Sequence, residues 1–149
     1  VADLDFSLVR SAAEFAEAPS DAAIVSARED IDWADHLVLV FPVWLGSAPA
    51  LLRGFLEQVG RAGFFVEITE RGCLPAMRGK SARLIVTMAA PSLMDRLGLG
   101  GHGLGTAVRS TLGLAGARPV RLTLFGGVTA KADQSERIES VRDLARREC

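Results

Sequence analysis

One continuous apolar run organises this sequence of 149 residues: Leu37-Val38-Leu39-Val40-Phe41, followed at once by Pro42-Val43-Trp44-Leu45-Gly46. The run does not alternate apolar with polar residues, which is typical of a strand covered on both faces in a parallel sheet. Proline and glycine then break the extended chain. The sequence therefore predicts a buried strand that leads directly into a sharp loop carrying Trp44.

Helices and strands alternate on both sides of this run. The segment Phe64–Ile68 is either a short extra strand or part of a long insert. Strand, helix, strand, helix is the signature of an α/β protein with a doubly wound parallel sheet and helices on both faces. The other predicted elements are a helix from a cap at Ser20 or Asp21 to near Trp33, a helix opened by Ser47 and Pro49 and stopped by Gly60, a strand at Leu84–Val86, a helix over Thr106–Ala115, a strand over Val120–Phe125, and a last helix striped by Ile138, Val141, Leu144 and Ala145.

Composition excludes several classes of function. Hydrophobic residues make up 49% of the chain, and 17 Lys and Arg stand against 18 Asp and Glu, for a net charge of -1. This balance leaves no positive excess to attract nucleic acid or anionic lipid. No apolar run approaches the roughly 18 residues of a spanning helix, and the first residues lack a signal pattern. We expect a single cytoplasmic domain over residues 1–149, with no transmembrane segment.

Cysteine and histidine are scarce. Cys73, Cys149, His36 and His102 are the full set and are widely spaced, so we expect neither a disulfide framework nor a metal site. A Cys–His catalytic pair stays an open alternative. We interpret His36, at the start of the apolar strand, as a structural residue.

Ligands of doubly wound sheets lie beyond the carboxyl ends of the strands. This rule selects two segments, Pro42–Ser47 and Thr87–Gly105. Trp44 offers a surface on which a flat aromatic ligand could stack, and the alternative is a tryptophan that closes the top of the core. Lys80 and Arg83 lie at the opposite end of their strand, so we expect both side chains to face solvent.

The second segment is rich in glycine. Gly98, Gly100 and Gly103 have the spacing of a dinucleotide fingerprint, but Ser92–Leu97 separate them from the preceding strand, which favours a lid instead. His102 lies in this lid and is a candidate to donate a proton near neutral pH; the alternative is a solvated loop histidine.

One ordered series of motifs runs through Trp33–Trp44, Pro49–Phe55, Arg78–Ala82, Leu84–Thr87 and Gly116–Val120. This series resembles that of the flavodoxin-like NAD(P)H:quinone oxidoreductases. The resemblance covers most of residues 1–130. It implies a flavodoxin-like fold, bound FMN or FAD, NAD(P)H as co-substrate, a quinone-like acceptor and a homodimer whose sites are completed across the subunit interface.

The resemblance also implies roles for particular residues. Some family members support charge on the flavin with a tyrosine and a histidine; this chain has no tyrosine, Asp95 falls near the expected place, and His102 is the candidate for the other role. Residues along the flavin ring would be Phe41, Pro42, Val43, Trp44 and Leu45, and those at its polar end Thr87, Met88, Ala89 and Ala90.

A second departure concerns the start of the chain. The family's first strand, phosphate-binding loop and first helix precede a segment resembling Val1–Leu4, so the domain is expected to lack its first βα unit here. We expect an upstream segment to supply that unit, and the alternative is a chain that cannot hold flavin phosphate in the family manner. Two rival functions stay open: a flavin-binding regulatory subunit of the potassium-efflux ancillary type, and a flavin-free structural remnant.

Overall fold

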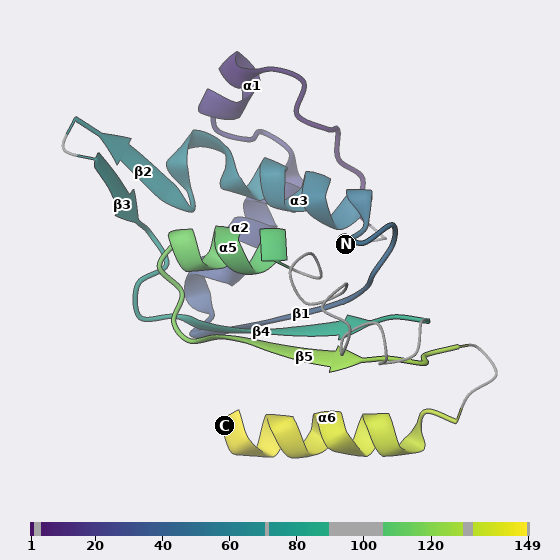
Figure 1. Ribbon diagram of the computed structural model, residues 1–149. Coiled ribbons are helices and arrows are strands. Elements are labelled where there is room, and N and C mark those ends of the chain that lie inside the picture. Colours follow the sequence, from purple (N-terminus) through teal and green to yellow (C-terminus); the bar gives the residue numbers. More distant parts are fainter. Residues whose placement is uncertain (2–3, 71, 90–105, 130–132, 149) are drawn as a thin grey trace.

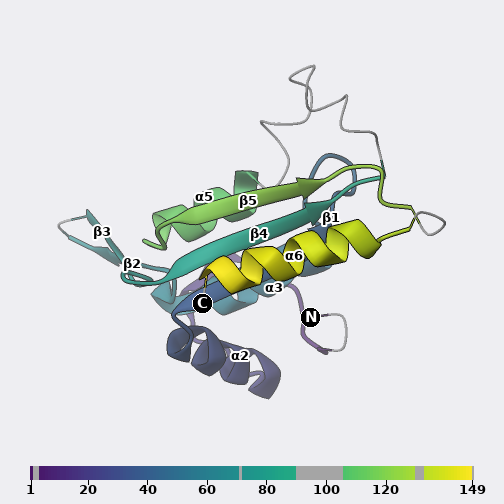
Figure 2. The same cartoon turned by 90° about the horizontal axis from the view of Figure 1, so that it is seen from below.

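Three parallel strands form the main sheet of the computed structural model, which describes residues 1, 4–70, 72–89, 106–129 and 133–148 (Figure 1). The strands are β1 (His36–Pro42), β4 (Ser81–Thr87) and β5 (Val120–Phe125), with β4 in the centre. One face carries α2 (Ala22–Trp33), α3 (Ala50–Gly60) and α5 (Thr106–Leu114), and α6 (Ser135–Glu148) lies along the other (Figures 1 and 2). The predicted α/β architecture is confirmed.

Local chemistry fixes the helix starts. Asp21, not Ser20, caps α2, because its carboxylate accepts the amides of Ala23 at 2.9 Å and Ile24 at 3.3 Å. Pro49 precedes α3, where its preset φ suits a helix start and its missing N–H costs nothing. No helix in the described ranges is both long enough and apolar enough to cross a bilayer.

A hairpin stands apart from the main sheet. Strands β2 (Val66–Thr69) and β3 (Gly72–Pro75) pair antiparallel and project beyond the end of α3 (Figure 1). The ambiguous segment Phe64–Ile68 therefore contains the start of a strand. Three elements were not predicted: strand β3, the short helix α1 (Ala12–Ala16) and the 3-10 turn η1 (Arg61–Gly63).

Side chains that bond to backbone carbonyls join α1, α2 and η1 to the end of α3. Arg28 donates through Nε to the Val59 carbonyl at 2.9 Å and through Nη2 to the Arg61 carbonyl. Arg61 in turn donates to the carbonyls of Glu14, at 2.9 Å, and Glu17, at 3.1 Å. These bonds bring side-chain donors to carbonyls at the ends of the elements, where the backbone ladder of a helix leaves acceptors with spare capacity.

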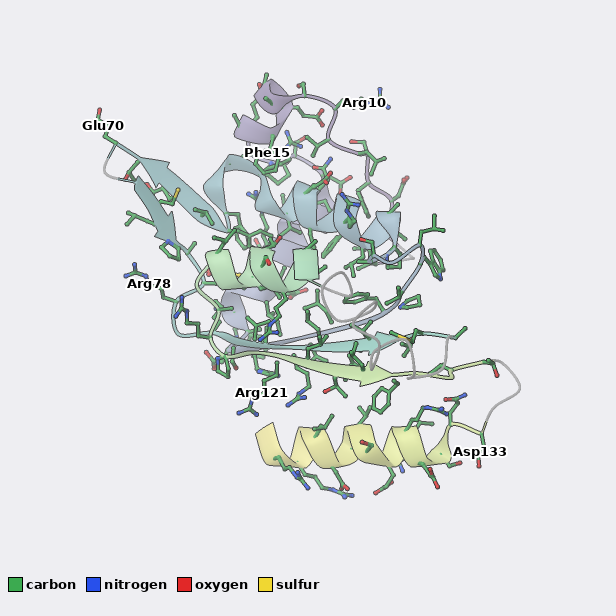
Figure 3. The ribbon with its side chains drawn as sticks, viewed as in Figure 1. Arg10, Phe15, Glu70, Arg78, Arg121 and Asp133 are labelled. Atoms are coloured by element: carbon green, nitrogen blue, oxygen red, sulfur yellow. The ribbon has the colours of Figure 1, made fainter. Side chains whose placement is uncertain are left out.

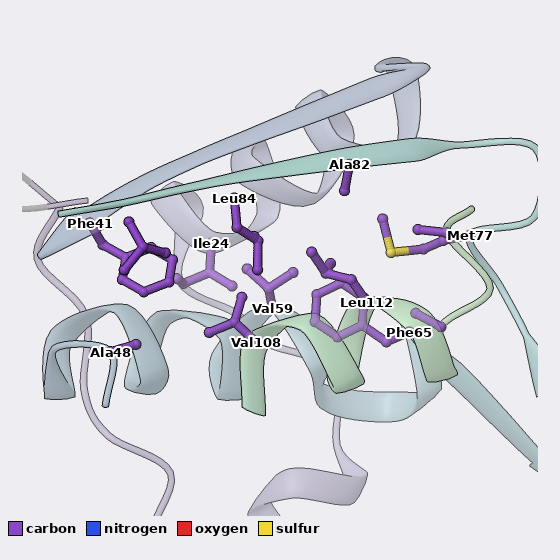
Figure 4. Close-up of a cluster of buried hydrophobic side chains, with 13 residues drawn as sticks. Ile24, Phe41, Ala48, Val59, Phe65, Met77, Ala82, Leu84, Val108 and Leu112 are labelled. Carbon is purple, nitrogen blue, oxygen red and sulfur yellow. The ribbon is translucent and has the colours of Figure 1, made fainter. Parts of the chain in front are cut away.

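The core lies between the sheet and the layer of α2, α3 and α5 (Figure 4). Its side chains come from β4, from the inner face of β1 and from the facing sides of the helices. The largest fully buried ones are Ile24, Leu84, Leu112, Val59 and Val86.

The prediction that the Leu37–Phe41 strand is covered on both faces is wrong. Phe41 is buried and Leu39 half-buried, but Val38 and Val40 on the other face are 54% and 66% exposed. The strand covered on both faces is β4, in which Ala82 through Val86 are all buried. The reason is position: β1 is the outermost strand of the described sheet, whereas β4 lies between two strands.

The expectation of solvated Lys80 and Arg83 is also wrong. Arg83 is only 8% exposed and donates to Thr123 Oγ1 on β5 at 2.7 Å. Lys80 is half-buried and donates through Nζ to the Ala34 carbonyl at 2.9 Å. A side chain on a central strand is covered by the helices on its own face of the sheet, so proximity to a strand end does not imply exposure.

Candidate functional site

Two segments leave neighbouring strands at the carboxyl end of the main sheet, which is called the site edge below. Strands β1 and β4 run parallel, with Pro42 opposite Thr87 in the register. Immediately beyond, the Val43 amide donates to the Thr87 carbonyl at 2.7 Å. The structure therefore brings together the starts of the two segments that the sequence selected.

A third segment joins this edge. The Met88 amide donates to the Phe125 carbonyl at 2.9 Å, and the Val128 amide donates to the Met88 carbonyl at 2.9 Å. Arg137 of α6 donates to the Gly126 carbonyl at 3.0 Å. The segment after β5 was not among those that the sequence selected, although the glycine pair Gly126-Gly127 directly after a predicted strand was the available signal.

The segment after β1 forms a tight turn. Trp44 and Ser47 exchange backbone hydrogen bonds of 2.9 and 3.0 Å, and the two residues between them, Leu45 and Gly46, have φ values of 50° and 75°. Two positive φ values are the mark of a type I′ turn, which suits Asn or Gly. For leucine this conformation costs roughly 1–2 kcal/mol.

The turn presents apolar surface to solvent. Trp44 is 63% exposed and Leu45 is fully exposed, so Trp44 does not close the top of the core. Phe41 is buried just below, Pro42 is exposed and Val43 half-buried. Backbone strain and exposed apolar side chains both reduce stability, and both are common at binding sites. Their presence in one turn therefore indicates a binding site.

The second segment offers a mixture of groups. Thr87 is half-buried, Met88 is buried and Ala89 is exposed. Residues 41–49 and 87–89 include no ionisable side chain. This part of the edge can therefore supply a stacking surface, backbone amides and a hydroxyl, and any proton donor must come from another part of the chain.

Several predicted site residues lie outside the described part of the structure. They are Ala90, Asp95 and His102, together with the glycine pattern at 98–103. His36 lies at the far end of β1, where Nδ1 is 2.7 Å from Ser81 Oγ, which agrees with a structural role. Cys73 is exposed on β3. The described residues contain no group of three or more His, Cys, Asp or Glu placed to hold a metal ion.

Among the described residues, two side chains have shifted pKa values: Arg28 on α2, away from the site edge, and Asp133 at the start of α6, whose carbonyl accepts a hydrogen bond from the same Arg137 that bonds to Gly126. Burial, and secondarily the nearby Arg61, lower the pKa of Arg28, whose guanidinium carbon lies 4.8 Å from the centre of the Phe64 ring. A hydrogen bond from the Ser135 hydroxyl lowers the pKa of Asp133 at the start of α6. Both groups act in structure: Arg28 holds the end of α3, and Asp133 the start of α6.

Comparisons with known proteins agree with this architecture. A family model described as "Flavodoxin-like fold" matches residues 2–147. The chain is 26% identical over 122 residues to FMN-dependent NADH:quinone oxidoreductase 1 of Bacillus subtilis, a match that covers 75% of this chain and 56% of that protein. The chain thus spans little more than half the length of this relative.

Solved structures give the same result. Smu.1420 from Streptococcus mutans superposes with a TM-score of 0.69 at 28% identity, covering 96% of this chain and 73% of that one. The NAD(P)H:quinone oxidoreductase from Methanothermobacter marburgensis has a TM-score of 0.64 at 20% identity, covering 92% and 73% of the two chains. At that identity the second likeness concerns the fold alone.

Proposed function

Because this chain belongs to the flavodoxin-like fold family, we propose that it is a flavin-dependent oxidoreductase that passes a hydride from NAD(P)H, through bound FMN or FAD, to a quinone or similar acceptor. Its distant relationship to an FMN-dependent NADH:quinone oxidoreductase supports FMN and NADH as the first pair to test. The observation that carries the proposal is the junction of two segments at one sheet edge, where the Val43 amide meets the Thr87 carbonyl.

The residues at this edge suit a planar, largely apolar ring. Trp44 and Leu45 are exposed, and the turn between Trp44 and Ser47 holds them outward. We propose that Phe41–Leu45 lie along the ring and that Thr87–Ala90 meet its polar end. A bound flavin would supply the hydride chemistry, and the protein would bind and orient it and exclude water.

A residue outside these two segments has to hold the proton. Since residues 41–49 and 87–89 carry no ionisable group, we propose His102 as the side chain that holds a proton near the site. Changing His102 to Gln keeps a hydrogen-bonding side chain but removes titration near neutral pH. We expect slower flavin reduction with unchanged flavin affinity, and an unchanged reduction rate would remove this role.

The first experiment is spectroscopic. The purified protein should carry a yellow flavin, identified as FMN or FAD after release, and NADH or NADPH should bleach it. A quinone should then restore the colour. A protein that binds neither FMN nor FAD would overturn the proposal.

Trp44 can be tested against a matched residue. Trp33, at the end of α2, is also exposed but lies at the start of β1, the opposite edge from the Trp44 turn. Trp44→Ala should weaken flavin or quinone binding by about tenfold or more, which is the loss of one aromatic stacking contact of about 1–3 kcal/mol. Trp33→Ala should leave both affinities unchanged. Equal effects of the two changes would remove Trp44 from the site.

A second candidate function is a flavin-binding regulatory subunit of the potassium-efflux ancillary type. The absence of tyrosine from the chain favours it, since some family enzymes use one beside the flavin. The two candidates differ in one measurement. A regulatory subunit would hold flavin, but a quinone would not reoxidise it at a rate consistent with turnover.

A further inference from the structure

The parallel pairing of β4 with β5 continues past both strands and then contains an extra residue. The register of the two strands, continued by one residue, places Met88 opposite Gly126. A regular parallel ladder would then bring the Gly127 amide to the Met88 carbonyl. The Val128 amide donates there instead, at 2.9 Å. The segment after β5 therefore contains a β-bulge at Gly126 and Gly127.

The bulge needs glycine and leaves one amide out of the ladder. Gly127 has a φ of 68°, in the left-handed region that glycine adopts without strain. Its amide donates to no acceptor among the residues that the structure describes. A backbone donor is therefore available at the site edge, beside the segment that follows β4.

An arginine of α6 holds this bulge. Arg137 is half-buried and donates through Nη2 to the Gly126 carbonyl at 3.0 Å. Its Nη1 donates to the Asp133 carbonyl at 3.2 Å and to Gln134 Oε1 at 3.1 Å. Asp133 lies at the start of α6, which runs along the sheet beneath β5 (Figure 3). The guanidinium thus joins the bulge to the beginning of a helix.

The bulge lies directly beside the second segment of the candidate site. Met88 donates to the Phe125 carbonyl and accepts from the Val128 amide, so the segments after β4 and β5 are bonded on both sides of this residue. The proposed function places Thr87–Ala90 at the polar end of a flavin ring. That end carries carbonyl oxygens and ring nitrogens, which accept hydrogen bonds from N–H donors.

We propose that Arg137 is a positioning residue of the flavin site. By holding the Gly126 carbonyl, it keeps the bulge in the shape that offers the Gly127 amide to the polar end of the ring, and the segment after β5 forms a third wall of the site. A donor that is fixed before binding costs little to order when the ligand arrives. This inference rests on the proposed function, because it takes the bound group to be a flavin.

Two arginines of α6 provide the first test. Arg137→Ala removes the bonds to the bulge, and fluorescence titration should show that the dissociation constant of FMN or FAD rises by about tenfold, because the segment must then be ordered on binding. Arg142→Ala removes an exposed ion pair of 3.0 Å with Glu139 on the same helix and should leave the constant within about twofold. Equal effects of the two changes would overturn the inference.

Two glycines separate flavin binding from stability. Gly127 and Gly63 have φ values of 68° and 76°, and an added methyl group would meet no atom closer than 3.6 Å at either position. Gly127→Ala and Gly63→Ala should therefore lower Tm by similar amounts through backbone strain. Only Gly127→Ala should also weaken flavin binding, by about tenfold. Flavin binding that weakens equally in both variants would contradict the role of the bulge.

Hydrogen exchange gives a measurement that needs no bound flavin. In the flavin-free protein, Arg137→Ala should speed exchange of the Val128 amide by about tenfold, because the bulge is then held at fewer points. The Val43 amide, bonded to the Thr87 carbonyl on the other side of β4, should exchange at an unchanged rate. An unaltered rate at Val128 would show that Arg137 does not hold this segment.

The result is separable from that of the proposed function. A protein that binds flavin and reduces a quinone, with binding that the Arg137 and Gly127 variants leave unchanged, contradicts only this inference. A protein that binds flavin and responds to both variants as expected, but passes no hydride to a quinone, contradicts only the proposed activity. An unaltered protein that binds neither FMN nor FAD contradicts both.

Discussion

Strands β1 and β4 are neighbours with similar apolar sequences and opposite environments. From Ala82 to Val86, β4 is buried on both faces, while β1 buries Phe41 and leaves Val38 and Val40 exposed. Hydropathy along the strand does not distinguish the two. Position in the sheet distinguishes them, since β4 lies between two strands and β1 is outermost. The same valine therefore contributes differently to stability on β4 and on β1.

The largest expected effect is in β4. Leu84 is fully buried between the strands and the helix layer. Leu84→Ala should lower the free energy of unfolding by about 2–5 kcal/mol, from lost apolar burial and the cavity that remains. Urea denaturation measures this loss. A change below about 1 kcal/mol would mean that the core can collapse around the site.

A matched pair of valines tests the comparison directly. Val86 on β4 is fully buried, and Val40 on β1 is mostly exposed. Val86→Thr should cost about 1–3 kcal/mol because it buries a hydroxyl. Val40→Thr should change stability by less than about 0.5 kcal/mol. Equal costs, measured by urea denaturation, would show that the outer face of β1 is covered in solution.

The strands also differ just past their ends, where β1 enters the strained turn and β4 continues into the buried Met88. Leu45→Asn should raise stability by about 1 kcal/mol, because Asn tolerates positive φ and the exposed leucine loses no packing. Thermal unfolding measures the gain. If Leu45 lies along the flavin as proposed, the same variant should bind flavin more weakly. A variant with unchanged stability would indicate that the turn adopts another conformation.

The smallest effect concerns α6, which lies on the same side of the sheet as the exposed valines. Asp133 Oδ1 accepts the Ser135 amide at 2.9 Å and the Ser135 hydroxyl at 2.7 Å. These bonds lower the pKa of Asp133 in the folded state. Its contribution is therefore present above the pKa of the unfolded chain and is lost as pH falls through the lower, folded value.

Asp133→Asn isolates this contribution. The wild-type protein should have a slightly higher Tm than the variant at neutral pH, and the difference should shrink as the pH is lowered below the carboxyl range. Ser135→Ala serves as a control that removes the hydroxyl donor and keeps the carboxylate. A Tm difference that does not vary with pH would mean that Asp133 stabilises the start of α6 through hydrogen bonds that do not depend on its charge.

Local signals account for what could be predicted from the sequence. The cap at Asp21, Pro49 before α3 and Gly60 at its end all act within a few residues. These signals made the alternation of helices and strands along the chain predictable. The meeting of the segments after β1 and β4 could also be predicted, because parallel strands place their carboxyl ends together.

What could not be predicted depends on residues far apart in the chain. Burial of Arg83 and exposure of Val40 are set by which strand lies beside each one. The positive φ of Leu45 has no signal in its residue type, since leucine rarely adopts it. An apolar groove lined by residues of α1, α3, α5 and the hairpin is likewise assembled only when the chain folds.

The bonds of Arg28 and Arg61 have a consequence for motion. Because these two side chains join α2, α1 and the end of α3 through backbone carbonyls, none of these segments can separate without breaking these hydrogen bonds. We expect them to open together, as one cooperative unit of local unfolding, and their amides to share a single opening free energy in hydrogen exchange.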